Sequence, residues 1–202
     1  EVTDVIRSGE RITGARVTTP DGVVDVNALL TIGADGRHSV VRERAGLVVR
    51  TFGAPIDVLW MRLSRRRSDR SETLGVIRPG RVFVMLNRAE YWQCAFVIPK
   101  GGYAELHARG LDSFRADIAA VVPFLADRVE ELRTWEDIKL LTVIIDRLER
   151  WYAPGLLCIG DAAHAMSPIG GVGINLAVQD AVAAANLLYR PLLAGAVSLE
   201  HL

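Results

Sequence analysis

The feature that most constrains the fold of this 202-residue chain is the run of residues 160–175, which opens on Gly-Asp and contains a glycine-rich turn. A short apolar segment, residues 156–159, precedes it and has the length of a buried strand. A helical pattern follows over residues 173–188, and Pro191 predicts its end. Strand, tight turn and helix in this order indicate an α/β protein, in which ligands bind at the carboxyl ends of strands.

The residue types in this run suit a flat ligand that carries hydroxyl groups. A carboxylate at the strand end, Asp161, can accept hydrogen bonds from sugar-like hydroxyls. The glycines let backbone N–H groups approach the ligand closely, and the following helix points its positive end at the same place. The predicted binding residues are Gly160, Asp161, Pro168, Gly170, Gly171, Val172, Gly173 and Asn175. The alternative is a strand–turn–helix in which Asp161 is only a capping residue.

A second motif, residues 33–42, has a similar design. The apolar run 28–32 reads as a buried strand that ends in Gly-Ala-Asp-Gly, and a short helix is predicted over 39–45. Ser39 can cap that helix, and Arg42 can pair with a carboxylate or a phosphate. Asp35, Gly36 and Arg42 are the predicted cofactor-binding residues of this motif, although Ser39 and Arg42 can equally serve only to support the fold.

Together the two motifs resemble those of the flavoprotein aromatic hydroxylases, the family of para-hydroxybenzoate and phenol hydroxylases. The resemblance implies that Asp161 binds the ribityl chain of FAD and that the backbone of residues 168–175 lies along the pyrimidine edge of the flavin. The helix end would then stabilise the anionic reduced flavin. In the family, the motif around Asp35 is linked to both FAD and NAD(P)H.

The resemblance also implies a mixed α/β (α+β) fold, with a Rossmann-like FAD-binding domain of the para-hydroxybenzoate hydroxylase type and a β-sheet substrate domain. The predicted limits are 1–54 and 151–202 for the FAD-binding domain and 55–150 for the substrate domain. The G-x-G-x-x-G unit that cradles the FAD pyrophosphate in this family does not occur. We therefore expect an incomplete FAD-binding domain, a fragment that binds FAD weakly or not at all.

Residues outside the motifs are predicted to form mainly strands. The expected strands are 2–7, 11–18, 23–26, 56–63, 74–77, 82–86, 91–98 and 140–145, and residues 102–133 have helical character. Aromatic and apolar side chains of the middle strands are candidates for a substrate pocket, and core packing is the alternative for each. These candidates are Trp60, Met61, Trp92, Gln93, Phe96 and Leu141.

The resemblance implies an FAD-dependent monooxygenase that hydroxylates an aromatic or polycyclic small molecule with NAD(P)H and O2, through a flavin C4a-hydroperoxide. This chemistry requires no catalytic side chain, and none is predicted; His164 is expected to be structural. A flavin reductase, a dehydrogenase or an epoxidase on the same scaffold is the nearest alternative, while the W-x-W-x-x-I pattern of flavin halogenases is absent. A binding protein without redox chemistry is the alternative of another class.

Composition excludes several other classes. The 24 basic and 24 acidic residues cancel, so no net field would attract nucleic acid, and the arginines at 65–67 are expected in a solvated loop. Cys94 and Cys158 lie in apolar runs, which predicts buried free thiols and neither a disulfide nor a metal site. No apolar run has the roughly 18 residues of a membrane span, and we expect a reduced, cytoplasmic compartment. The oligomeric state is not predicted.

Overall fold

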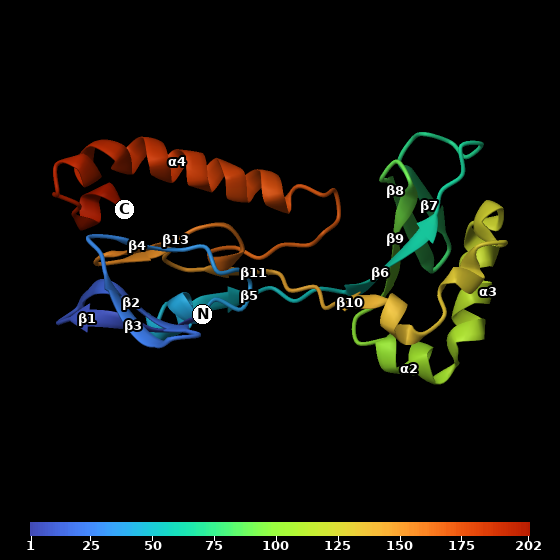
Figure 1. Ribbon diagram of the computed structural model, residues 1–202, viewed down its shortest axis with the longest axis horizontal. Helices are drawn as coiled ribbons and strands as arrows, with labels where there is room; N and C mark the ends of the chain where they lie inside the picture. Colours follow the sequence, from blue (N-terminus) through green and yellow to red (C-terminus); the bar gives the residue numbers. More distant parts are fainter. The chain divides into compact units, whose positions relative to one another are not determined.

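The computed structural model describes all residues from 1 to 202, and the chain divides into two compact units. Unit 1 consists of Glu1–Gly53 and Ile144–Leu202, and unit 2 consists of Ala54–Val143 (Figure 1). The predicted limit at residue 150 is wrong: the segment 144–150 belongs to unit 1. The physical reason is backbone pairing, because a strand within this segment pairs with a strand that precedes unit 2.

Unit 1 contains three small sheets and one long helix. The strands are β1 (Val2–Ser8), β2 (Arg11–Thr19), β3 (Gly22–Asn27), β4 (Thr31–Gly33), β5 (Val49–Thr51), β11 (Asp146–Leu148), β12 (Tyr152–Ala153) and β13 (Leu156–Cys158). The helices are α1 (Val40–Arg44) and α4 (Gly173–Leu193), with short 3-10 turns η4 (Gly160–Ala162) and η5 (Leu199–His201). Strands β1, β2 and β3 form an antiparallel meander, β5 pairs with β11, and β13 lies between β12 and β4.

The structure contains the predicted strands and helices of unit 1 with three differences, and it adds the short strands β5, β11 and β12, which were not predicted. The strand expected over 28–32 is β4, which begins only at Thr31. Helix α4 continues through Pro191 to Leu193, because a proline in the last turn removes one N–H group without preventing the final residues from keeping helical geometry. Strand β4 is at the edge of its sheet, so Ile32 is 45% exposed where a fully buried strand was expected. Helix α4 runs alongside the sheet of β4 and β13 (Figure 1).

Unit 2 is a five-stranded antiparallel sheet with helices on one face. In sheet order, its strands are β10 (Lys139–Leu141), β6 (Ile56–Ser64), β9 (Tyr91–Pro99), β8 (Arg81–Asn87) and β7 (Leu74–Arg78). The helices are α2 (Tyr103–Ala108) and α3 (Leu111–Val121), followed by the 3-10 turns η1 (Pro123–Leu125), η2 (Val129–Glu131) and η3 (Trp135–Asp137). The predicted strand 140–145 is shorter than expected, since β10 ends at Leu141.

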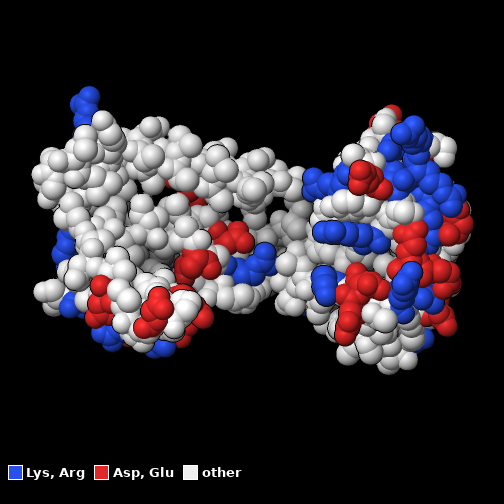
Figure 2. All heavy atoms as spheres, in the orientation of Figure 1, with Lys and Arg blue, Asp and Glu red and all other residues white.

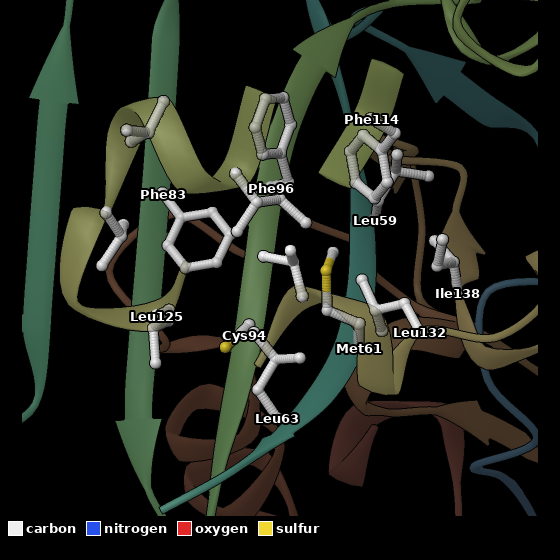
Figure 3. Close-up of a cluster of buried hydrophobic side chains, with 14 of the residues drawn as sticks. Leu59, Met61, Leu63, Phe83, Cys94, Phe96, Phe114, Leu125, Leu132 and Ile138 are labelled. Carbon is white, nitrogen blue, oxygen red and sulfur yellow. The ribbon is translucent and has the colours of Figure 1, made fainter. Parts of the chain in front are cut away.

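Successive side chains along each strand point to alternate faces of this sheet. Side chains such as Leu59, Phe83 and Phe96 point toward α3 and form the buried core (Figure 3). Residues one position away along the strands, such as Trp60 and Ala95, are paired across β6 and β9 and lie on the opposite face. No helix of unit 2 covers that opposite face, which we call the open face.

Candidate functional site

The two motifs meet at one edge of a parallel strand pair. Strands β4 and β13 run parallel, with Cys158 opposite Gly33, and the N–H of Ile159 donates to the carbonyl of Gly33 at 2.9 Å. The backbone segments that follow β4 and β13 therefore leave the sheet side by side. An ion pair of 3.6 Å between Arg37 and Asp161 links the two segments that follow the strands. The structure thus brings together the strand ends that the sequence singled out.

The turn at Gly160 is fixed against helix α4 and requires glycine for two reasons. Its φ of +58° is left-handed, and a Cβ at this position would lie 3.2 Å from the Cβ of Ala177. The N–H of Gly160 donates to Asp180 on α4 at 2.8 Å. Asp180 also lies 2.6 Å from His164 Nε2, and the His164 ring packs on Trp151. His164 therefore serves the framework of the turn, as predicted.

Sequence reasoning missed Asp180, although a signal for it was present. It is the only carboxylate in α4, a helix otherwise rich in alanine and leucine, and it lies seven residues after Gly173 on the same side of the helix. A lone charged residue on a side of the helix that faces the sheet needs a buried partner. Here that partner is a backbone N–H of the motif itself.

The glycine turn before α4 is open. Gly170 and Gly171 have φ values of +85° and +64°, and a Cβ at Gly171 would meet no atom within 4 Å. Helix α4 has no side-chain cap and no acidic residue in its first turn, and the N–H groups of Gly170 and Val172 have no acceptor in the chain. Free N–H groups at the start of a 21-residue helix suit an electron-rich ligand edge.

A cavity of about 430 Å³ connects the motifs to the helix. Its lining residues are Ala34, Gly36, Ile159, Gly160, Asp161, Gly173, Ile174, Ala177 and Ala181. The volume is within the range of small-molecule sites. The side chain of Asp161 is 36% exposed and contacts only Arg37, so its oxygens remain available as acceptors.

A second cavity of about 540 Å³ adjoins the other side of the first turns of α4. It is lined by Phe52, Ile145, Asp146, Arg147, Trp151, His164, Ala165, Met166, Leu176 and Asp180. Only the smaller cavity is lined by residues of both motifs, and for this reason we take it as the candidate site.

The side chains of Asp35 and Ser39 hold helix α1. Asp35 Oδ2 accepts a hydrogen bond from the N–H of Val41 at 3.1 Å, and Ser39 Oγ accepts one from the N–H of Arg42 at 3.0 Å. Asp35 remains exposed, so a further contact with a cofactor stays a prediction. Ser39 is buried and acts as the helix cap, the supporting role anticipated for it.

The structure does not support a direct cofactor contact by Arg42. Its guanidinium is buried and donates to the carboxylate of Asp146, to the carbonyl of Ala162 and to the carbonyl of Arg37. Its donors are thus occupied by protein groups, and it ties α1 to β11 and η4. The sequence could not reveal this, because Asp146 is 104 positions away along the chain.

Both cysteines are buried and free, as predicted. Burial, with a smaller contribution from the Asp35 carboxylate, raises the pKa of Cys158 to about 12, so this thiol next to the site stays neutral. No group of three or more His, Cys, Asp or Glu side chains is arranged to hold a metal ion. None of the helices combines the length and apolarity needed to traverse a bilayer.

The substrate-pocket prediction requires a correction, because Trp92 and Gln93 are adjacent in β9 and point to opposite faces. Trp92 has no exposed surface, and its Nε1 donates to Asp69 at 3.1 Å. Met61 and Phe96 share the helix-covered face with it. These three side chains are core residues.

The remaining pocket candidates lie on the open face and are half-buried. Trp60 and Gln93 are on β6 and β9, and Leu141 is opposite Val58 on β10. The side-chain oxygen of Gln93 accepts a hydrogen bond from Arg88 Nε at 2.9 Å, which supplies the partner that a glutamine between aromatic residues needs. Their contact with a substrate stays a prediction.

Comparison with known proteins agrees with this architecture. A family described as "FAD binding domain" matches residues 1–199. The 6-methylpretetramide 4-monooxygenase of Streptomyces rimosus is 41% identical over 170 residues, which cover 81% of this chain and 39% of that protein. A digeranylgeranylglycerophospholipid reductase of Thermoplasma volcanium is 30% identical over 195 residues, covering 91% of this chain and 46% of that protein.

Among solved structures, pqsL, a probable FAD-dependent monooxygenase from Pseudomonas aeruginosa, superposes with a TM-score of 0.78 at 25% identity. The match covers 100% of this chain and 56% of that one. The chain thus spans less than half the length of the curated relatives named above. The mixed α/β fold of the para-hydroxybenzoate hydroxylase type, implied by the resemblance, is confirmed. The chain belongs to the FAD-binding domain family.

Proposed function

We propose that the protein containing this chain is an FAD-dependent monooxygenase that hydroxylates an aromatic or polycyclic small molecule with NAD(P)H and O2. One observation carries the proposal: the Asp161 and Asp35 motifs emerge side by side from parallel strands, next to the uncapped start of α4. The similarity to 6-methylpretetramide 4-monooxygenase supports the reaction class.

The residues at this edge fit FAD. The carboxylate of Asp161 would accept hydrogen bonds from ribityl hydroxyls, since only Arg37 contacts it within the chain. The backbone of residues 168–175 would run along the pyrimidine edge, where open glycines permit close approach. The positive end of α4 would favour negative charge on that edge. Bound FAD supplies the oxygen chemistry, and this chain binds and orients it.

The open face of unit 2 is the proposed substrate surface. Its centre is apolar: the half-buried side chains of Trp60 and Val84 lie on either side of the buried Ala95, in register across three strands. Polar groups lie further along the same strands, where Arg88 donates to Gln93 and Arg62 lies over the Tyr91 ring at 4.9 Å. An apolar surface with a few convergent polar groups suits a flat aromatic molecule with oxygen substituents.

The reductase is the second candidate, because the digeranylgeranylglycerophospholipid reductase matches 91% of this chain. Oxygen consumption separates the two functions. A monooxygenase consumes O2 together with NAD(P)H and forms a hydroxylated product, whereas a reductase saturates a double bond without consuming O2.

The test uses the full-length protein. A visible flavin spectrum, together with NAD(P)H oxidation and O2 uptake that an aromatic substrate stimulates, would support the proposal. Asp161→Ala should lower flavin occupancy at least about tenfold, because the flavin hydroxyls lose the charged acceptor of their hydrogen bonds. Asp21→Ala, in an exposed turn, is the matched control and should retain flavin. Full occupancy in the Asp161 variant, or a colourless wild-type protein, would refute the assignment.

A further inference from the structure

A cavity of about 520 Å³ in unit 2 has no role in the function proposed above. Its lining comes from β7, from β8, from the end of α3 with η1, and from the loop before β7: Ser68, Asp69, Arg70, Leu74, Gly75, Val76, Arg78, Met85, Val121, Val122, Pro123 and Phe124. Most of these side chains are apolar, and the volume lies within the range of small-molecule sites.

The cavity lies on the helix-covered side of the sheet. Leu74 pairs with Met85 and Val76 pairs with Phe83, and both partners belong to the buried core beneath α3. Trp60 and Gln93 point to the other face of the same sheet. A molecule in this cavity would therefore be separated from the open face by the sheet itself.

The one carboxylate that lines the cavity is already neutralised. Asp69 accepts two hydrogen bonds from Arg128, one from Trp92 and one from the N–H of Arg66. Both members of the Asp69–Arg128 pair are almost fully buried. The guanidinium of Arg128 holds the pKa of Asp69 well below its usual range, so this pair is stably ionised and contributes no net charge.

Two cations at the cavity remain without a partner. The side chains of Arg70 and Arg78 are exposed and form no ion pair or hydrogen bond within the chain. Most other arginines of unit 2 do find an acceptor: Arg81, for example, pairs with Asp117. In the space-filling view, basic side chains of this unit lie interspersed with acidic ones (Figure 2). An apolar cavity with two unpaired guanidinium groups is complementary to an apolar molecule with an anionic end.

We propose that this cavity binds an amphipathic organic anion, an aromatic or aliphatic body with one carboxylate, sulfonate or phosphate group. The body would contact Leu74, Val76 and Phe124, and the anionic group would accept hydrogen bonds from Arg70 and Arg78. The proposal does not depend on the flavin, because none of the lining residues belongs to unit 1.

The test measures binding of 2-naphthoate to the full-length protein by titration calorimetry. The double variant Arg70→Gln/Arg78→Gln should bind at least about tenfold more weakly, because two charge-assisted hydrogen bonds are lost. Both positions are exposed, so the variant should fold normally. The neutral isostere 2-naphthamide should also bind about tenfold more weakly than 2-naphthoate.

Arg67→Gln is the matched control, because Arg67 is an exposed, unpaired arginine of the same loop that does not line the cavity. It should leave the affinity for 2-naphthoate within about twofold. The Asp161→Ala protein should bind 2-naphthoate as the wild type does, which separates this site from the flavin site. No detectable binding at about 1 mM, or equal affinity in the double variant and the wild type, would overturn the proposal.

Discussion

Units 1 and 2 differ in how completely they bury their apolar surface. In unit 2, α2, α3 and the 3-10 turns close over one face of the sheet, and large side chains such as Phe83, Phe96 and Phe114 are almost fully buried (Figure 3). In unit 1, helix α4 buries only Ala184 and Leu188. More than half of the surface of several apolar side chains on α4 is exposed: Ile174, Val178, Val182, Leu187 and Leu193. Few charged groups interrupt this surface (Figure 2).

The contrast separates two ways of holding a structure together. Unit 2 packs its side chains around a contiguous core, and the buried ion pair Asp69–Arg128 lies beside that core. Unit 1 fixes its strand ends with directional contacts, among them the buried pair Arg42–Asp146 and the hydrogen bond from Gly160 to Asp180. Such contacts position a backbone for a ligand. The exposed apolar surface of α4 is of a different kind, because an extended apolar patch typically marks a surface that binds a ligand or another part of a protein.

The largest expected effect is in unit 2. Asp69→Ala leaves buried Arg128 with only the half-exposed carboxylate of Asp127, 3.3 Å from its Nε, and should lower the free energy of unfolding of this unit by about 3 kcal/mol. Chemical denaturation followed by tryptophan fluorescence measures it, because three of the four tryptophans, Trp60, Trp92 and Trp135, lie in unit 2. A loss below about 1 kcal/mol would mean that packing alone holds this unit, and the pair would be dispensable.

The same ion pair predicts a pH dependence. The pKa of Asp69 is lowered by Arg128, so the pair contributes its full stability above the unfolded-state pKa of about 4. As the pH falls below this value toward the folded-state pKa, the unfolded state takes up the proton more readily, and the contribution is lost. Asp69→Asn should therefore show a weaker loss of unit 2 stability between about pH 4 and pH 2 than the wild type.

A smaller effect is expected at the turn that positions the proposed flavin site. Gly160→Ala should lower the stability of unit 1 by about 2–3 kcal/mol, because the new Cβ combines a left-handed φ with a close approach to Ala177. Gly46→Ala is the matched control: its φ is +72°, but a Cβ there would meet nothing within 4 Å. It should cost only the conformational term of about 1 kcal/mol. Equal losses would show that packing against α4 does not constrain the turn.

The sequence predicted most of the secondary structure, because strong local signals delimit it. The turn residues Pro79-Gly80 separate β7 from β8, and residues 88–90 of the predicted turn 87–90 separate β8 from β9. The Gly-Asp and Asp-Gly motifs likewise marked strand ends that the structure places side by side.

What the sequence did not predict depends on partners far away along the chain. The role of Arg42 is set by Asp146, and the assignment of residues 144–150 to unit 1 is set by pairing of β11 with β5. Trp92 was misassigned for a different reason: strand periodicity puts it and Gln93 on opposite faces, but only the folded sheet shows which face the helices cover.

The smallest expected effect tests the exposed apolar surface of α4. Leu187 is 69% exposed, so Leu187→Gln should change the stability of the 202-residue chain by no more than about 0.5 kcal/mol. The adjacent Leu188 is 1% exposed, and Leu188→Ala should cost about 2–5 kcal/mol in the same measurement. Repeating both substitutions in the full-length protein sharpens the comparison. If Leu187→Gln then costs more than about 1 kcal/mol, other residues of the full-length protein pack on this side of α4. The apolar surface that unit 1 leaves exposed would then be an interface with those residues. If the small effect persists, the apolar surface is solvated in the whole protein, and the difference between the two units is intrinsic to them.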